Sequence, residues 1–279
     1  MDTILHWYPI GTAWLGIEHY PASNQSNSTA ILVHGFRAWH RWGFFPYIAR
    51  TLSSFNIATS VIALPSSGYG PAGFQYELFA TGTISTDLEA LRYALDNVRR
   101  DSEHVIGIGH SRGALLLALC HWQLDCLTMW SPPRYFGRWS DRQRAEWRLR
   151  GMFNAGSHLE TGKPLLLNIS YLDDLEQNDY NAQLDRALVE SNTPTCVIVG
   201  QQDMVAPPRQ AEELFAVLQM SNRCLRIIPG AGHTFGISHG SPMPTPPLMQ
   251  ALNATLEFLR TCCPQSGNFA SNAIINGTQ

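Results

Sequence analysis

The chain carries little charge and almost no lysine. Charged residues make up 15% of its 279 residues, and Lys163 is the single lysine among 19 basic side chains. The formal net charge is −3, with no excess of basic residues of the kind that binds nucleic acid or an anionic membrane surface. The composition therefore gives no reason to expect either of these as a partner.

The sequence also has no long apolar run and no metal-ligand spacing, and we expect no signal peptide. No apolar stretch approaches the ~20 residues that a membrane-spanning helix needs. Residues 1–6 lack the basic flank and apolar core of a signal peptide. Most cysteines lie in apolar segments, as buried free thiols do, so we expect a reducing, cytoplasmic location and no metal. The six are Cys120, Cys126, Cys196, Cys224, Cys262 and Cys263.

What the chain does contain is a repeated alternation of apolar strand-like segments and amphipathic helices. Residues 4–19 suit an antiparallel edge hairpin. Strands are expected at 30–33, 57–64, 105–108, 127–130, 195–199 and 224–228, and helices at 42–52, 85–99, 114–119, 207–219 and 247–259. This alternation predicts an α/β fold with a mostly parallel central sheet covered by helices on both faces. In such sheets the functional site lies at the carboxyl ends of the strands.

The alternation breaks between residues 131 and 192. For this segment we expect a charged helix at 140–148, a hairpin at 152–167 and an acidic helical stretch at 172–186. Because regular alternation resumes afterwards, we interpret the segment as a helical cap inserted into one domain that spans residues 1–263. Residues 264–279 are polar and rich in Asn, Ser and Gly, so we expect a loosely ordered tail.

One strand-to-helix junction has the sequence Gly109-His110-Ser111-Arg112-Gly113. A strand that enters a helix through Gly-x-Ser-x-Gly is typical of a nucleophile elbow, which exposes the serine above the sheet. Side chains two places before and after Ser111 would collide with the neighbouring strand and helix, which explains both glycines. The helix N-terminus also favours negative charge at this point. The alternative is that Ser111 merely caps the helix.

A serine hydroxyl is a poor nucleophile without a base, and His233 is the best candidate for that base. It lies in a glycine-rich loop, 229–235, directly after the predicted strand that ends at Ile228. His239 is an alternative only six residues further on. His34 and His110 lie inside motifs that need them for turn structure. The remaining histidines, which lack a comparable loop after a strand, are His6, His19, His40, His104, His121 and His158.

The base needs an acid to orient it, and Asp203 is the preferred acid. It follows the predicted strand 195–199, again at a carboxyl end. Asp173 and Asp174 are rivals, but they belong to an acidic helical run that is typical of solvated surface charge. The order Ser, Asp, His along the chain is the one found in the α/β-hydrolase fold.

An oxyanion hole should use two backbone N–H groups. Arg112, the residue after the candidate nucleophile, would supply one, and its side chain is incidental to that role. Phe36 would supply the other, because His34-Gly35-Phe36 follows the early strand 30–33.

On these motifs the chain resembles an α/β-hydrolase of the dienelactone hydrolase-like or serine aminopeptidase-like group, in the style of bacterial esterases. The likeness spans residues 14–259 and rests on segments 34–36, 109–113, 200–203 and 230–235. It implies a triad of Ser111, Asp203 and His233, with no metal and no organic cofactor. Dienelactone hydrolases are similar but use cysteine as the nucleophile, so Ser111 shifts the expected activity toward ordinary esters. Haloalkane dehalogenases and epoxide hydrolases need an aspartate there and are disfavoured.

Aromatic residues in loops near the expected site are candidates for lining an apolar substrate pocket, although core packing is the competing interpretation. The candidates are Trp39, Tyr69, Trp130 and Tyr135. We therefore expect hydrolysis of a small-molecule carboxylic ester. Action on a thioester, amide or carbon–carbon bond, acyl transfer, and a non-catalytic ligand receptor remain alternatives. The arginines of 138–150 either attract an acidic substrate or pair with acidic residues of the cap. The oligomeric state is left open.

Overall fold

A computed structural model describes residues 3–137, 139–238, 240–241 and 243–264. In this part of the chain eight strands form one sheet, in which five neighbouring pairs run parallel and the two pairs at one edge run antiparallel. Their order across the sheet is β1 (Ile4–Ile10), β2 (Ala13–Tyr20), β4 (Ala58–Ala63), β3 (Ser28–Val33), β7 (His104–His110), β8 (Cys126–Trp130), β11 (Thr195–Gly200) and β12 (Arg223–Ile228). The mostly parallel sheet and the edge hairpin β1–β2 are as predicted.

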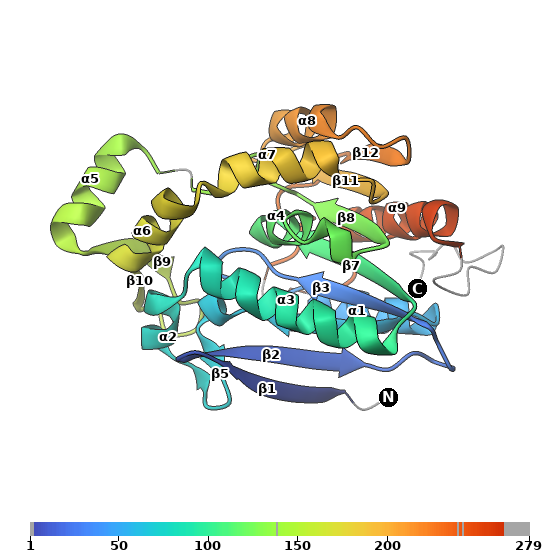
Figure 1. Cartoon of the computed structure of the whole chain (residues 1–279), viewed down its shortest axis with the longest axis horizontal. Helices are drawn as coiled ribbons and strands as arrows, with labels where there is room; N and C mark the ends of the chain where they lie inside the picture. Colours follow the sequence, from blue (N-terminus) through green and yellow to red (C-terminus); the bar gives the residue numbers. More distant parts are fainter. Residues whose placement is uncertain (1–2, 138, 239, 242, 265–279) are drawn as a thin grey trace.

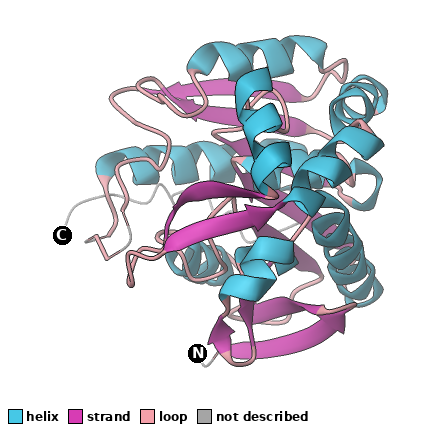
Figure 2. Cartoon of the chain, turned by 90° about the vertical axis from the view of Figure 1, so that its left-hand side faces the viewer, coloured by secondary structure: helices cyan, strands magenta, loops and turns pink. Residues whose placement is uncertain are grey.

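Helices cover both faces of this sheet (Figures 1 and 2). Side chains alternate along each strand, so Ala30 and Leu32 of β3 pack toward one face while Ile31 and Val33 pack toward the other. The first face is covered by α1 (Phe45–Ser54) and α9 (Pro246–Cys262). The second is covered by α3 (Ile84–Asp101), α4 (Arg112–Ala118), α7 (Tyr180–Glu190) and α8 (Pro208–Val217). In the described residues no helix combines the length and the apolar character that crossing a bilayer requires.

The order of the strands places a switch point at the centre of the sheet. From β3 the chain moves to β4 on one side and then returns to β7 on the other. β3 and β7 are neighbours, and Val33 lies opposite Gly109 in their register. Loops that leave two such strands in opposite directions leave a crevice between them, which is where open α/β sheets bind ligands. The loop after β3 and the junction after β7 are therefore brought face to face.

The segment between β8 and β11 contains α5 (Asp141–Arg150), the hairpin of β9 (Met152–Ser157) and β10 (Pro164–Asn168), and α6 (Ile169–Asn178) before α7. α5, α6 and the hairpin project from one end of the sheet (Figure 1). The single helical stretch expected at 172–186 is wrong, because two helices meet at Asp179. That residue has φ 40° and its side chain accepts a hydrogen bond from the backbone of Ala182, so it ends one helix and begins the next.

Smaller elements follow β4 along the chain. They are the 3-10 turn η1 (Pro65–Ser67), the short ribbon of β5 (Tyr69–Gly70) and β6 (Gly73–Phe74), and α2 (Tyr76–Thr81). α3 begins one residue earlier than predicted, because Thr83 is its cap and accepts a hydrogen bond from the backbone of Thr86. His239 and all but the first residue of the predicted tail lie outside the described residues.

The cysteines correct one expectation. Cys196 of β11 and Cys224 of β12 are register partners, with their Cα atoms 4.7 Å apart, and they form a disulfide. The prediction of free thiols is therefore wrong for this pair, because nothing in the sequence shows which residues of two parallel strands face each other. Of the other described cysteines, Cys120 and Cys126 are buried, and Cys262 and Cys263 are half-buried.

Candidate active site

Ser111 occupies the sharp turn between β7 and α4. Its backbone has φ 53° and ψ −124°, a conformation that costs a non-glycine residue about 1–3 kcal/mol. The turn is secured where the Ser111 N–H donates to the carbonyl oxygen of Trp130 at 2.8 Å. This geometry matches the elbow that the pentapeptide predicts, and it differs from the extended backbone of an ordinary N-cap serine.

Both glycines of the pentapeptide are required because neighbouring backbone atoms lie too close to them for a side chain to fit. A Cβ on Gly109 would lie 2.5 Å from Cα of Ala114 at the start of α4. A Cβ on Gly113 would lie 2.4 Å from the carbonyl oxygen of Val33, at the end of β3. Any side chain at either position would push the helix or the strand away, so the tight turn at Ser111 depends on both.

Asp203 and His233 meet above the carboxyl ends of β11 and β12. Oδ2 of Asp203 lies 2.8 Å from Nδ1 of His233. Oδ1 of Asp203 accepts hydrogen bonds from the backbone N–H groups of Val205 and Ala206, both at 2.8 Å. Asp203 is 2% exposed, so these three partners hold its carboxylate in one orientation. The hydrogen bond between Asp203 and His233 thus joins two of the three triad candidates, the acid and the base.

The surroundings of Asp203 favour its ionised form. Burial raises the pKa of Asp203, but the hydrogen bond and charge of His233 and the two backbone N–H donors outweigh it and hold the pKa below its ordinary value. An ionised carboxylate at Nδ1 keeps the imidazole proton on that nitrogen. Nε2 of His233 is then free to accept a proton from another group.

One cavity of about 470 Å³ contains both Ser111 and His233 in its wall. The loop after β3 also lines it through Gly35 and Phe36, and a Cβ on Gly35 would lie 2.9 Å from Cβ of Ser111. The candidate nucleophile, the candidate base and the candidate oxyanion loop thus border a single space. We call it the catalytic cavity.

The far wall of the catalytic cavity is aromatic and is completed by the β9–β10 hairpin. Trp39 and Tyr69, both predicted pocket residues, line it with their rings stacked 5.2 Å apart. From the hairpin come Ser157, His158, Leu159, Glu160 and Leu165. The tip of the hairpin is held against the ribbon and α2, where His158 packs 4.3 Å from the ring of Phe74. The inserted segment thus forms part of the wall of the space above Ser111.

A second cavity of about 310 Å³ lies beside Phe36. Ser111 and Phe36 line both cavities, so both spaces reach the candidate nucleophile. Tyr135, the third predicted pocket residue, lines the second cavity. The remaining lining residues are Arg112, Leu115, Pro133, Phe136, Gly137, Trp139, Gln143 and Tyr171.

The prediction of Trp130 as a pocket residue is wrong. It is 1% exposed, and its indole N–H donates to Oγ1 of Thr255 on α9 at 3.0 Å. Its ring packs against Phe44 and Phe235. At the end of β8 its side chain points to the α1–α9 face of the sheet, and it therefore belongs to the core.

The side chain of Arg112 makes contacts that the sequence did not reveal. Its guanidinium lies 3.0 Å from Oδ2 of the fully buried Asp87 on α3, and donates to Oγ of Ser66 at 2.5 Å and to the Tyr171 hydroxyl at 3.1 Å. It also lies over the ring of Phe36, 5.2 Å from the centroid. Arg112 therefore links α3, the inserted segment and the candidate oxyanion loop.

Two further buried histidines position the loops of the site. Burial lowers the pKa of His110 to about 3, so its ring is neutral, and its Nε2–H donates to the carbonyl oxygen of His233 at 3.0 Å. Burial also lowers the pKa of His34 to about 3; its Nε2 accepts from the Leu64 N–H at 3.1 Å. Their role in the motifs is thus to hold backbone turns, as expected.

The rival acids lie elsewhere. Asp174 accepts a hydrogen bond from the Ser85 backbone at 3.1 Å, and Asp173 pairs with Arg148 at 3.3 Å. Other arginines of α5 also pair with carboxylates of the insertion, as for Arg144 and Glu176 at 3.6 Å. Within the described ranges no three His, Cys, Asp or Glu side chains gather as a metal site requires.

Comparison with known proteins places the chain in a structural class. Residues 30–244 match the model of a family described as the alpha/beta hydrolase family. A search of curated proteins finds no match.

Solved structures show the same fold at low identity. A protein of Agrobacterium vitis S4, described as a hydrolase, is 18% identical with a TM-score of 0.74, over 92% of this chain and 99% of that one. Est1E from Butyrivibrio proteoclasticus with ferulic acid bound is 17% identical with a TM-score of 0.70, over 92% and 98%. A monoacylglycerol lipase of Paleococcus ferrophilus is 14% identical with a TM-score of 0.70, over 89% and 99%.

Proposed function

The chain belongs to the alpha/beta hydrolase family, and from that premise we propose that it is a serine hydrolase which cleaves carboxylic esters of small molecules. The observation that carries the proposal is the ionised Asp203 bonded to His233 at 2.8 Å, with His233 and the strained Ser111 in the wall of one cavity. A base held by a buried carboxylate beside an exposed serine is the arrangement that nucleophilic acyl transfer requires.

Acylation would start when Nε2 of His233 takes the hydroxyl proton of Ser111 as its oxygen attacks the ester carbonyl. The negative oxygen of the tetrahedral intermediate would lie at the start of α4, between the backbone N–H groups of Phe36 and Arg112. The helix N-terminus favours negative charge at the same point. Asp203 stabilises the imidazolium that forms, and His233 then protonates the leaving alcohol.

Deacylation would reverse these roles. A water molecule takes the place of the alcohol, gives its proton to His233 and attacks the acyl carbonyl on Ser111. The same two N–H groups stabilise the second tetrahedral intermediate, and the acid leaves as Ser111 regains its proton. No metal or organic cofactor takes part in this proposal.

The two cavities beside Phe36 support an ester substrate with two distinct parts. The larger is walled by stacked aromatic rings and suits an apolar or aryl group, and the smaller would take the other side of the ester. We propose that the segment 131–192 acts as a cap within one domain, since it supplies walls to both cavities. The ferulic acid bound to Est1E and the lipase among the structural neighbours support this class of substrate.

The test is labelling by a fluorophosphonate probe together with hydrolysis of p-nitrophenyl esters of increasing acyl length. We expect wild-type protein to be labelled and active, and Ser111→Ala to lose both. Ser67→Ala is the matched control, because Ser67 lines the same cavity and should leave labelling intact. A wild-type protein that is neither labelled nor active on any ester would contradict the proposal and favour a non-catalytic receptor.

A further inference from the structure

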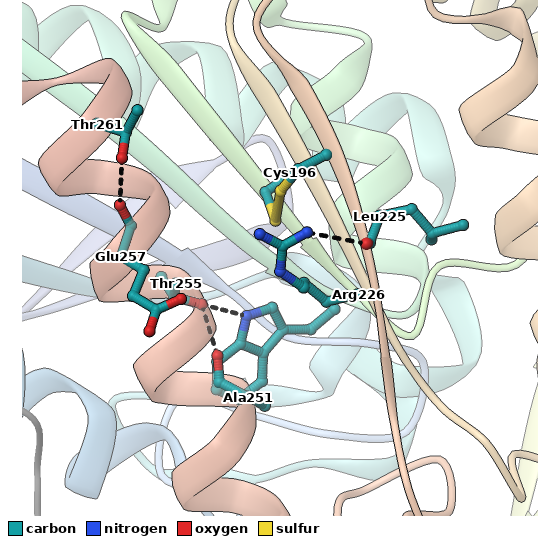
Figure 3. Close-up of a disulfide and its surroundings, with 9 residues drawn as sticks. Cys196, Leu225, Arg226, Ala251, Thr255, Glu257 and Thr261 are labelled. Atoms are coloured by element: carbon teal, nitrogen blue, oxygen red, sulfur yellow. Dashed lines mark hydrogen bonds between the residues drawn. A yellow bond between two sulfur atoms is a disulfide. The ribbon is translucent and has the colours of Figure 1, made fainter.

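A third cavity, of about 350 Å³, lies at the opposite end of the sheet from Ser111. It opens between the start of the edge strand β12 and the last turns of α9, whereas the catalytic residues follow the carboxyl ends of the strands. Figure 3 shows this region around the disulfide. The lining residues are Ser221, Asn222, Arg223, Cys224, Arg226, Glu257, Phe258, Arg260, Thr261 and Cys262.

The cavity gives access to one end of the disulfide. Cys224 is half-buried and lines the cavity, whereas Cys196 is fully buried and does not. A reagent in the cavity would therefore meet the disulfide from the side of Cys224. Cys262 brings a free, half-buried thiol to the same wall.

The charge in this wall is mostly positive. The wall contains three arginines, Arg223, Arg226 and Arg260, and a single carboxylate, that of Glu257. The guanidinium of Arg226 donates to the carbonyl oxygen of Leu225 at 3.3 Å, whereas that of Arg223 donates to the carbonyl oxygens of Phe215 and Leu218 and lies over the Phe215 ring. None of the three arginines forms an ion pair with another described residue, so Arg226 and Arg260 are the two available to an anion in the cavity.

Arg226 and the disulfide lie on the same side of the strand. Arg226 stands two residues after Cys224 on β12, so both side chains point to the α9 face. Figure 3 shows the guanidinium of Arg226 on that face, in the space between β12 and α9. An anion that occupies the cavity would therefore lie near both the arginines and Cys224.

We propose that this cavity is a modification site, where a small thiol that carries carboxylates exchanges with the Cys196–Cys224 disulfide. The incoming thiolate attacks Sγ of Cys224, a mixed disulfide forms there, and the bond to Sγ of Cys196 breaks. Cys196 leaves with the electron pair and takes up the proton that the incoming thiol lost. One disulfide is consumed and one formed, so no oxidant or reductant is needed.

The arginines would favour this class of thiol in two ways. They bind its carboxylates, and they stabilise the thiolate, which is the nucleophilic form. The cavity volume of about 350 Å³ lies in the ~300–1,000 Å³ range of small-molecule sites. A thiol without carboxylates would gain only the second interaction, and a cationic thiol would be repelled.

The experiment compares rates of opening of the disulfide in a Cys262→Ser variant, which removes the second thiol from the cavity. Reduced glutathione is the anionic probe and 2-mercaptoethanol the neutral one; adducts are located by peptide mass spectrometry after acid quenching. The ratio of the two rates is measured for the folded protein and for the same protein unfolded in urea. We expect the folded protein to favour glutathione by about tenfold more than the unfolded one, with the adduct on Cys224.

The test of charge removes two arginines from the cavity. Arg226→Gln with Arg260→Gln should bring the ratio close to that of the unfolded protein, while Arg150→Gln, an exposed arginine of α5 outside this cavity, should leave it unchanged. The proposal is overturned if the folded and unfolded ratios agree, if the cavity variants keep the wild-type ratio, if the adduct maps to Cys196, or if a thiol count of untreated protein finds no disulfide. None of these outcomes depends on esterase activity.

Discussion

Replacing Arg112 by methionine should destabilise the fold more than any surface charge substitution in this chain. The change removes the ion pair with Asp87 at 3.0 Å and the hydrogen bonds to Ser66 and Tyr171, yet leaves the Asp87 carboxylate fully buried. Removing one partner of a buried pair costs about 3–5 kcal/mol, because the other charge stays out of water. Asp87 keeps only its two hydrogen bonds from Ser66, at 2.9 and 2.6 Å.

The loss of folding stability in Arg112→Met should depend on pH in a defined direction. Burial already raises the pKa of Asp87 above its ordinary value, and Arg112 opposes that rise. Without Arg112 the pKa of Asp87 rises further, so the folded variant holds a proton that the unfolded chain has lost. Stability is then greatest below the ordinary carboxyl pKa and falls as pH rises through the folded value. The difference between wild type and variant should therefore widen as pH rises from the folded pKa of Asp87 in the wild type, itself above the ordinary carboxyl value, to the higher folded pKa in the variant.

Urea denaturation of wild type and Arg112→Met at several pH values is the measurement. The matched control is Arg112→Met with Asp87→Asn, which removes the buried charge while the new amide oxygen still accepts from Ser66, and should recover more than half of the loss. A loss below about 1 kcal/mol, the range of exposed ion pairs, would refute the description of this pair as buried and coupled. So would a loss that does not change with pH.

Three further predictions concern the site. Asp203→Asn should lower kcat by about 10³–10⁴-fold with little change in KM, because His233 loses the carboxylate that sets its tautomer, and steady-state kinetics on a p-nitrophenyl ester measures this. His110→Leu, which loses the donor to the His233 carbonyl, should lower kcat by about tenfold, whereas His110→Gln should restore most of it; equal rates for the two would argue against the positioning role. Trp39→Ala should raise KM for aryl esters by about tenfold and leave kcat near wild type, because Tyr69 loses its stacking partner.

The main features of the fold and the candidate triad could be predicted from local patterns. Ser111, Asp203 and His233 each follow an apolar strand, and parallel strands bring such positions to one edge of a sheet. The two glycines around Ser111 fit the close approach that the structure measures.

What the sequence did not reveal depends on pairings between distant segments. The register that sets Cys196 opposite Cys224 is not encoded in either strand alone, and the prediction of a reducing compartment loses the support that free thiols gave it. The sequence predicts Trp130 as a pocket residue because a tryptophan at a strand end looks the same in sequence whether it faces the core or the crevice. The partners of Arg112 lie on α3, η1 and α6, three segments with no shared local signal.

Phe36 combines two features that can vary independently. The proposed oxyanion contact uses its backbone N–H, which nearly every amino acid would also supply, whereas its ring lies beside the two cavities that meet at Ser111. A smaller side chain at this position would widen the two spaces, and a larger one would narrow both. Substitution of this single residue could thus change the range of substrates while leaving Ser111, Asp203 and His233 unchanged.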